Sequence, residues 1–132
     1  MDPYGNAPGL EEEWAVQAMQ FAEQHWQTRH HTPLTPFDDQ LYGAFRARFP
    51  HLAVDPLDVT ELKRPEARVA WRQLLEGVVK ELLPDDWNFG TLLRIRDELA
   101  YTDDNTVLVP RGQFYCIEVA RLRERRRNGS AN

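Results

Sequence analysis

The sequence predicts a mainly α-helical domain, a compact fold of about four to five helices with one small β-hairpin. Several segments repeat apolar residues every three to four positions, which is the period of an amphipathic helix. Only two short runs, 91–96 and 106–110, are apolar or β-branched without that period. The chain has 132 residues, 42% of them apolar or aromatic, which suits one domain with a real core.

We expect the helical domain to occupy residues 11–122, between a flexible N-terminal tail at 1–10 and a basic C-terminal tail at 123–132. The first ten residues are rich in Pro and Gly and contain no helical period. The last ten contain almost only Arg and small polar residues, so they offer nothing apolar to bury. The C-terminal tail is therefore expected to be dispensable for folding.

The first helix is predicted from residue 11 onward by two neighbouring apolar rows. The first row contains Trp14, Ala18, Phe21 and His25, and the second contains Ala15, Met19, Ala22 and Trp26. Both rows recur at spacings of three and four, so together they form a broad apolar face. Three acidic residues at 11–13 suit the positive end of the helix dipole.

Capping signals predict the starts of the next helices. Thr35 is a natural N-cap residue, Pro36 suits a first helical turn, and Asp38 stands where a capping partner would. Asp58 opens a second segment in the same way. Pro65 either separates a short turn from a new helix or starts the main helix itself.

The clearest helical period of the chain follows, and it predicts a buried face formed by Trp71, Leu74, Leu75, Val78, Val79 and Leu82. The runs 91–96 and 106–110 then predict an antiparallel hairpin, which must pack on the helices because a lone two-stranded ribbon is not stable. A last helix is predicted from 113, although the β-rich run 113–119 is also compatible with a strand.

Composition narrows the classes of function. The formal net charge is −5. The sequence contains no run of about 18 apolar residues, the length that a membrane-spanning helix needs. The start lacks the basic and apolar regions of a secretory signal, and the single Cys116 cannot form an internal disulfide. We therefore expect a monomer in the cytoplasm or the nucleus, without membrane contact. The Arg-rich stretch 121–127 suits a helix C-terminus, so nucleic-acid binding is not expected.

No catalytic or metal-binding arrangement stands out. The adjacent pair His30-His31 lacks partners at metal-ligand spacing, and Cys116 has no neighbouring His that could activate it. The acid pairs have local structural explanations, and the common phosphate-binding and hydrolase motifs are absent. The sequence predicts no enzyme activity, no metal and no cofactor.

The stretch "DDWNFG", residues 85–90, is harder to interpret. It follows the end of a predicted helix at Pro84 and contains two large aromatic residues, Trp87 and Phe89. These side chains either fold back onto the core or form an exposed patch that binds a partner. The sequence pattern leaves both alternatives open.

Several stretches of the chain together resemble one eukaryotic family, the polysaccharide biosynthesis domain-containing proteins. The matching stretches are "FDDQLYGAFRARFP", "WRQLLEGV", "NFGTLLRIR", "AYTDDNT" and "VPRGQFYCIEVAR". The similarity extends from about Glu23 to Arg121. Three positions depart from the family pattern: Trp87 replaces a usual Tyr, Gly112 stands at a usually apolar position, and Leu122 replaces a usual Asn.

The resemblance implies a helical, non-enzymatic chaperone of translation elongation factor 1-alpha that binds the GTP-binding domain of this newly made partner. A small enzyme or accessory protein of polysaccharide biosynthesis, and a general adaptor module, remain the alternatives. An enzyme acting on sugar nucleotides would need a nucleotide-binding sheet or a metal carboxylate site, for which the sequence provides no motif.

Polar and amphipathic residues of the hairpin and its approaches are the predicted partner-binding residues, because loops on a rigid base often carry binding groups. They are Asn88, Phe89, Gly90, Arg94, Arg96, Tyr101, Asp103, Asp104, Asn105 and Arg111. Arg and Tyr are also the residue types that most often contribute interface energy. The alternative is that Arg94 and Arg111 pair with nearby acids such as Asp97.

Overall fold

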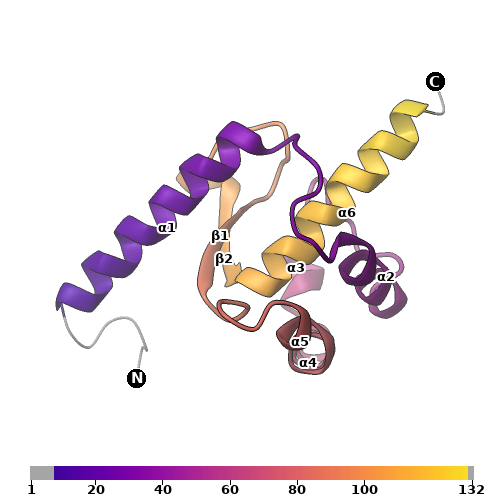
Figure 1. Ribbon diagram of the computed structural model, residues 1–132, viewed down its shortest axis with the longest axis horizontal. Coiled ribbons are helices and arrows are strands. Elements are labelled where there is room, and N and C mark those ends of the chain that lie inside the picture. The colour runs from indigo at the N-terminus through magenta and orange to yellow at the C-terminus, as the bar shows by residue number, and fades with distance from the viewer. Residues whose placement is uncertain (1–7, 131–132) are drawn as a thin grey trace.

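The computed structural model describes residues 8–130 and arranges helices around one two-stranded antiparallel sheet (Figure 1). The helical elements are α1 (Pro8–Thr28), α2 (Asp38–Arg48), α3 (Val59–Leu62), α4 (Pro65–Leu74), the π-helical segment η1 (Leu75–Val79), α5 (Lys80–Leu82), the 3-10 turn η2 (Asp103–Asn105) and α6 (Arg111–Ser130). The strands are β1 (Gly90–Arg94) and β2 (Thr106–Pro110). The predicted mainly helical class with one small sheet is confirmed.

The sheet separates two groups of helices. In Figure 1, α1 lies on one side of β1 and β2, whereas α6, α2 and α4 lie on the other. The strands pair with Gly90 opposite Pro110 and Arg94 opposite Thr106. The run 113–119 is helical, as part of α6, so the alternative of a strand there is wrong.

Helix α6 forms the centre of the core. Phe114, Ile117 and Ala120 of this helix are completely buried, together with Leu41 and Phe45 of α2. Farther out, the Trp71 ring stacks on Phe45 and Phe49, with centroid distances of 5.4 Å and 4.6 Å. Aromatic stacking of this kind stabilises a core beyond the area that it buries.

The predicted capping residues make the expected local contacts, although α2 begins later than the sequence suggests. The Thr35 hydroxyl accepts a hydrogen bond from the backbone N–H of Phe37 at 3.0 Å, and the Asp38 carboxylate accepts from the Thr35 N–H at 2.8 Å. Regular helix then starts at Asp38. In α3, the Asp58 carboxylate accepts from the N–H of Glu61 at 3.0 Å, as predicted.

Both alternatives for Pro65 are realised, because the short helix α3 ends at Leu62 and α4 begins with Pro65 in its first turn. The periodic residues Trp71, Leu74, Leu75 and Val79 are buried as expected. The period is interrupted by η1, a π-helical segment that the sequence pattern did not indicate.

The stretch 85–90 caps the N-terminus of α6. The backbone N–H of Arg111 donates to the Phe89 carbonyl at 2.9 Å, and that of Gly112 donates to the Trp87 carbonyl at 2.7 Å. The first N–H groups of a helix have no partner within the helix, so these carbonyls supply what α6 lacks. Trp87 also packs against the hydrophobic core. Of the two alternatives for this residue, folding back onto the core is therefore the one observed.

The helices extend into both segments that were predicted as tails. Helix α1 begins at Pro8, and α6 continues to Ser130. Residues 1–7 and 131–132 lie outside the described part, as do the side chains at 8–11 and 126–130. The Glu124 carboxylate accepts from the Tyr42 hydroxyl at 2.9 Å and from Arg46 Nε at 2.8 Å, while Arg123 pairs with Asp39. Helical structure and side-chain contacts therefore continue beyond Leu122, where the sequence predicted a tail.

Candidate protein-binding surface

Arg94 is the most deeply buried of the predicted partner-binding residues, and its side chain is not exposed at all. Its Nη2 atom lies 3.0 Å from Asp97 Oδ1 and 3.5 Å from Glu118 Oε2. The alternative in which Arg94 pairs with Asp97 is therefore the one that the structure supports. Because a carboxylate at this position would face two buried acids, charge reversal of Arg94 would test folding rather than binding.

Asn105 is also buried and organises the loop between the strands. Its Oδ1 accepts from the Arg96 N–H at 2.9 Å. Its Nδ2 donates to the carbonyls of Arg96, Leu99 and Ala100 at 3.1, 3.2 and 3.1 Å. One amide side chain thus satisfies four backbone groups, which explains an Asn at this position without any contact to a partner.

Arg111 and Gly90 are buried at the other end of the sheet. The Arg111 guanidinium lies 3.0 Å from Asp86 Oδ2 and over the Phe21 ring, 3.9 Å from its centroid. It also lies 4.8 Å from the centroid of Phe89, which is half-buried. Through these contacts Arg111, at the start of α6, connects α6 to α1 and to the 85–90 segment. Cation–π contacts of this kind favour Arg over Lys.

The remaining predicted residues are accessible. Tyr101 is half-buried, and the side chains of Asn88, Arg96, Asp103 and Asp104 are exposed. All except Asn88 lie on the loop 95–105 that Asn105 holds in shape. This loop is therefore the part of the predicted site that a partner could touch directly.

A buried polar cluster lies under the C-terminal half of α1 and supports the loop from below. His25 Nδ1 lies 2.9 Å from the Tyr101 hydroxyl, and His25 Nε2 lies 3.4 Å from Glu118 Oε2. Burial, together with the positive charges of Arg94, Arg121 and Arg29, lowers the pKa of His25 to about 3. The neutral ring can then accept a hydrogen bond from the Tyr101 hydroxyl at Nδ1, while Nε2 faces Glu118.

The Cys116 thiol is buried, and His30 contacts a cation. Burial raises the pKa of the Cys116 thiol to about 12, so the thiol is protonated and unreactive at neutral pH. His30 Nδ1 contacts Arg125 at 2.7 Å, which is the opposite of a metal-ligand environment. Within the described residues, no three His, Cys, Asp or Glu side chains form a group that could hold a metal ion.

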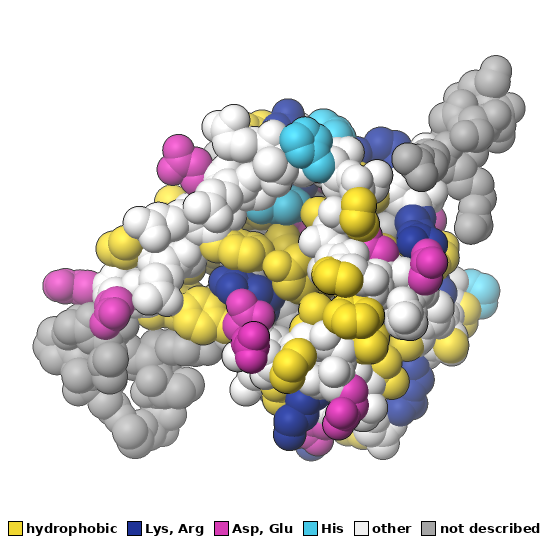
Figure 2. All heavy atoms as spheres, viewed as in Figure 1, with side chains coloured by type: hydrophobic (Ala, Val, Ile, Leu, Met, Phe, Trp, Pro, Cys, Tyr) yellow, Lys and Arg dark blue, Asp and Glu magenta, His cyan; other side chains and the backbone are white. Residues whose placement is uncertain are grey.

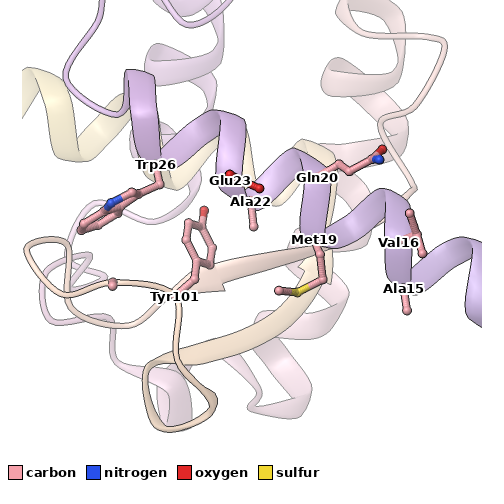
Figure 3. A pocket seen from close by; sticks show the side chains of 9 residues that line it. Ala15, Val16, Met19, Gln20, Ala22, Glu23, Trp26 and Tyr101 are labelled. Carbon is pink, nitrogen blue, oxygen red and sulfur yellow. The ribbon is translucent and has the colours of Figure 1, made fainter.

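An open, largely apolar groove of about 590 Å³ lies between α1 and the loop 95–105 and is here called the α1 groove (Figure 3). Figure 3 shows Tyr101 pointing from the loop toward α1, between Trp26 and Met19. Figure 2 faces a different side of α1 than Figure 3, and there too apolar side chains gather in a recess beside this helix. The lining residues are Ala15, Val16, Met19, Gln20, Ala22, Glu23, Trp26, Ala100 and Tyr101.

The sequence contained a signal for this groove that the residue predictions did not use. Helix α1 carries two apolar rows, but only the row with Ala18, Phe21 and His25 is needed to pack on the sheet and α6. The second row faces the groove, where Met19 is 59% exposed. An apolar face wider than one helix contact can bury is itself evidence for a binding surface.

Fold and surface together define a small, mainly helical domain with an open apolar groove on its first helix. None of the described helices is both long enough and apolar enough to span a bilayer. Comparison with known proteins then shows the family. The PBDC1 protein family model matches residues 10–130, and the chain belongs to this family. The resemblance to the polysaccharide biosynthesis domain-containing proteins is thereby confirmed.

Named relatives come from mammals and yeast. The chain is 43% identical to Protein PBDC1 of Mus musculus, over 93% of this chain and 64% of the relative, and 41% identical to that of Homo sapiens, over 93% and 54%. It therefore spans less than two thirds of either mammalian protein. Identity to the Saccharomyces cerevisiae homolog is 37%, over 88% of this chain and 84% of the homolog.

A solved structure shows the same fold. A solution NMR structure of a Saccharomyces cerevisiae protein matches with a TM-score of 0.75 and 36% sequence identity. The match covers 91% of this chain and 87% of the yeast chain. The overall fold is thus shared with an experimentally determined structure.

Proposed function

We propose that this protein is a non-enzymatic chaperone that assists the biogenesis of translation elongation factor 1-alpha by binding its GTP-binding domain. It acts in the cytoplasm as a monomer and needs no cofactor, membrane or nucleic acid. Membership of the PBDC1 family supports the proposal, since resemblance to that family implies this activity. The partner itself is identified by the resemblance alone.

The α1 groove is the observation that carries the binding activity. A newly made protein exposes apolar segments that will later be buried, and a chaperone needs an apolar surface that these segments can occupy. The groove offers Met19, Trp26 and Tyr101, a flexible thioether and two amphipathic rings. These side chains adapt to different partner surfaces at small cost in conformational entropy.

The charged residues of the loop 95–105 lie beside the apolar groove, where they can orient the bound partner. Arg96, Asp103 and Asp104 are exposed on the same loop that places Tyr101 in the groove. Charges at the rim of an interface mainly set its association rate and partner choice. The predicted contact residues on this loop therefore stay in the proposed interface, whereas Arg94 and Asn105 support the loop from beneath and Arg111 lies at the other end of the sheet.

The test is capture of elongation factor 1-alpha from an in vitro translation reaction by the tagged protein and by two variants. Met19→Glu places a charge in the α1 groove at a side chain that is 59% exposed, so folding should be unaffected. Val69→Glu makes the same kind of change on α4, where Val69 is 50% exposed and lines no groove described above. We expect Met19→Glu to reduce capture at least tenfold and Val69→Glu to leave it unchanged.

Equal capture by the two folded variants would show that the α1 groove does not bind the partner. If the unmodified protein captures no elongation factor 1-alpha, the proposed function itself is wrong.

A further inference from the structure

A second groove, of about 430 Å³, lies on a different part of the domain, between β2 and the helices α3 and α4; here it is called the β2 groove. Its walls are mixed and combine apolar side chains, including the rings of Trp71 and Trp87, with charged and amide side chains. At its rim, Leu108 is 47% exposed, an unusually open position for a large apolar side chain of a sheet. The proposed chaperone activity at the α1 groove makes no use of this surface.

The cations at the rim of the β2 groove have no ion-pair partner among the residues that the structure describes. Lys63, Arg68 and Arg72 line it together with only one acid, Glu76. None of these three cations forms an ion pair or hydrogen bond with a described side chain, whereas Arg46, Arg94 and Arg111 are all paired. In a chain of net charge −5, three such cations around one groove favour an acidic ligand.

The groove runs along the edge of β2. Three consecutive residues, Leu108, Val109 and Pro110, line it, although their side chains alternate between the two faces of the sheet. No residue of β1 lines the groove. This combination places the groove beside the strand, on the side opposite β1, rather than over one face of the sheet.

The backbone of β2 has hydrogen-bonding groups that point to this side. Arg111 N–H donates to the Phe89 carbonyl and Ile95 N–H to the Asn105 carbonyl, so positions 89, 91, 93 and 95 of the β1 segment form the hydrogen-bonded pairs. In an antiparallel ladder the intervening pairs turn their N–H and C=O groups outward. Leu108, opposite Leu92, is such a position, and no third strand covers it in the described residues.

We propose that the β2 groove binds an extended acidic peptide segment of a partner protein, which adds to β2 as a third strand. The N–H and C=O of Leu108 exchange hydrogen bonds with the peptide backbone, as in other strand-addition complexes. An apolar side chain of the peptide occupies the space between Trp71, Trp87 and Leu108. Its Asp or Glu side chains, on alternate positions, reach Lys63, Arg68 and Arg72.

The proposal can be tested by selecting from a library of random twelve-residue peptides displayed on phage, with the whole chain immobilised. We expect enrichment of sequences in which Asp or Glu alternates with apolar residues. Enriched peptides, synthesised and titrated by fluorescence polarisation, should bind the double variant Arg68→Glu, Arg72→Glu at least tenfold more weakly. Arg48→Glu makes the same kind of charge reversal on an exposed side chain of α2 outside the groove and should bind as the unmodified protein does.

A second variant tests the strand addition itself. Leu108→Pro removes an N–H that points away from β1, so the ladder between β1 and β2 stays complete while the outward hydrogen bond is lost. We expect about tenfold weaker peptide binding with an unchanged helical spectrum. Leu108→Val keeps the backbone N–H, so it serves as the control and should bind the peptide normally. If Leu108→Pro unfolds, a peptide N-methylated at alternate positions provides the same test from the ligand side.

Three results would overturn the proposal. One is a selection that enriches no sequences or only basic ones. Another is peptide binding that survives reversal of Arg68 and Arg72. The third is tight binding of a twelve-nucleotide single-stranded RNA that these reversals abolish and the selected peptides do not displace, which would assign the cations and the Trp rings to nucleic acid instead.

Discussion

Glu118 of α6 is the residue at which the buried charges of the domain meet. Its carboxylate lies 3.5 Å from Arg94 Nη2, 3.3 Å from Arg121 Nη1 and 3.4 Å from His25 Nε2. Arg121 also donates to the backbone carbonyls of Val54 and Ile95. Buried ions are tolerated only when each finds partners, so this cluster specifies how α1, the sheet and α6 fit together.

His25 makes the stability of the domain depend on pH. Its pKa is about 3 in the folded protein, against 6.5 for an ordinary His, so the unfolded chain binds a proton more readily than the folded one. The contribution of His25 to the free energy of unfolding is therefore complete above pH 6.5, and it is lost progressively as the pH falls toward 3. By pH 5 the loss amounts to about 2 kcal/mol.

The variant His25→Gln should remove this pH dependence. Gln can still accept a hydrogen bond from Tyr101 and keeps a polar amide beside Glu118, but it does not titrate. We expect the fall in unfolding free energy between pH 7 and pH 5, measured by urea denaturation, to be smaller in the variant by about 2 kcal/mol. An identical fall in both proteins would show that His25 is not buried in the neutral form.

At the scale of elements, the closest packing occurs where α6 starts beside η1. Gly112 lies here, and a Cβ atom at this position would stand 2.7 Å from Val79 Cγ1 and 2.8 Å from Leu75 Cδ2. The Trp87 carbonyl, 3.2 Å away, closes the third side. The missing side chain is therefore what lets α6 approach η1 and receive its cap from the 85–90 segment.

Gly112→Ala should consequently destabilise the domain by about 1–3 kcal/mol, the usual cost of overpacking a core. Gly43→Ala provides the matched control, because a Cβ at Gly43 meets nothing within 4 Å and Ala is the better helix former in α2. Thermal unfolding followed by circular dichroism should show a lower midpoint for the first variant and an equal or higher midpoint for the second. A Gly112→Ala protein as stable as the unmodified one would mean that the side chains of η1 can shift to make room for the added methyl group.

At the scale of the whole molecule, the sequence predicted the elements better than the site. Period and capping residues located the helices and the sheet, since both signals are local and depend on neighbours along the chain. The accessibility of Arg94, Asn105 and Arg111 was not predictable in this way. All three are polar residues that the fold buries. Arg111 contacts Thr91 and Arg94 contacts Glu118, each 20 or more residues away in the chain. Asn105 is buried because its own loop folds around it.

The contacts at the C-terminal end of α6 were not predictable for a similar reason. The Arg-rich end of α6 contains few apolar residues, and composition alone indicated a solvated tail. The partners that hold it, Asp39, Tyr42 and Arg46, lie on α2, some 80 residues earlier in the chain. Asp97 adds a contact from the loop 95–105 to Arg125. Charged residues at the end of a helix can thus belong to a folded domain when the acceptors come from distant elements.

Two truncations distinguish a tail from a structural end of α6. Ending the chain after Leu122 removes Glu124 and leaves the Arg46 guanidinium, which is partly buried, without its carboxylate partner. We expect the melting temperature to fall by about 5 °C or more, since losing charge-assisted hydrogen bonds of this kind costs about 1–2 kcal/mol in a domain of this size. Ending it after Arg125 keeps every described contact of α6 and should change the melting temperature by less than about 2 °C. Equal melting temperatures for the two truncated proteins would place the boundary at 122, because Glu124 would then contribute nothing to the folded state.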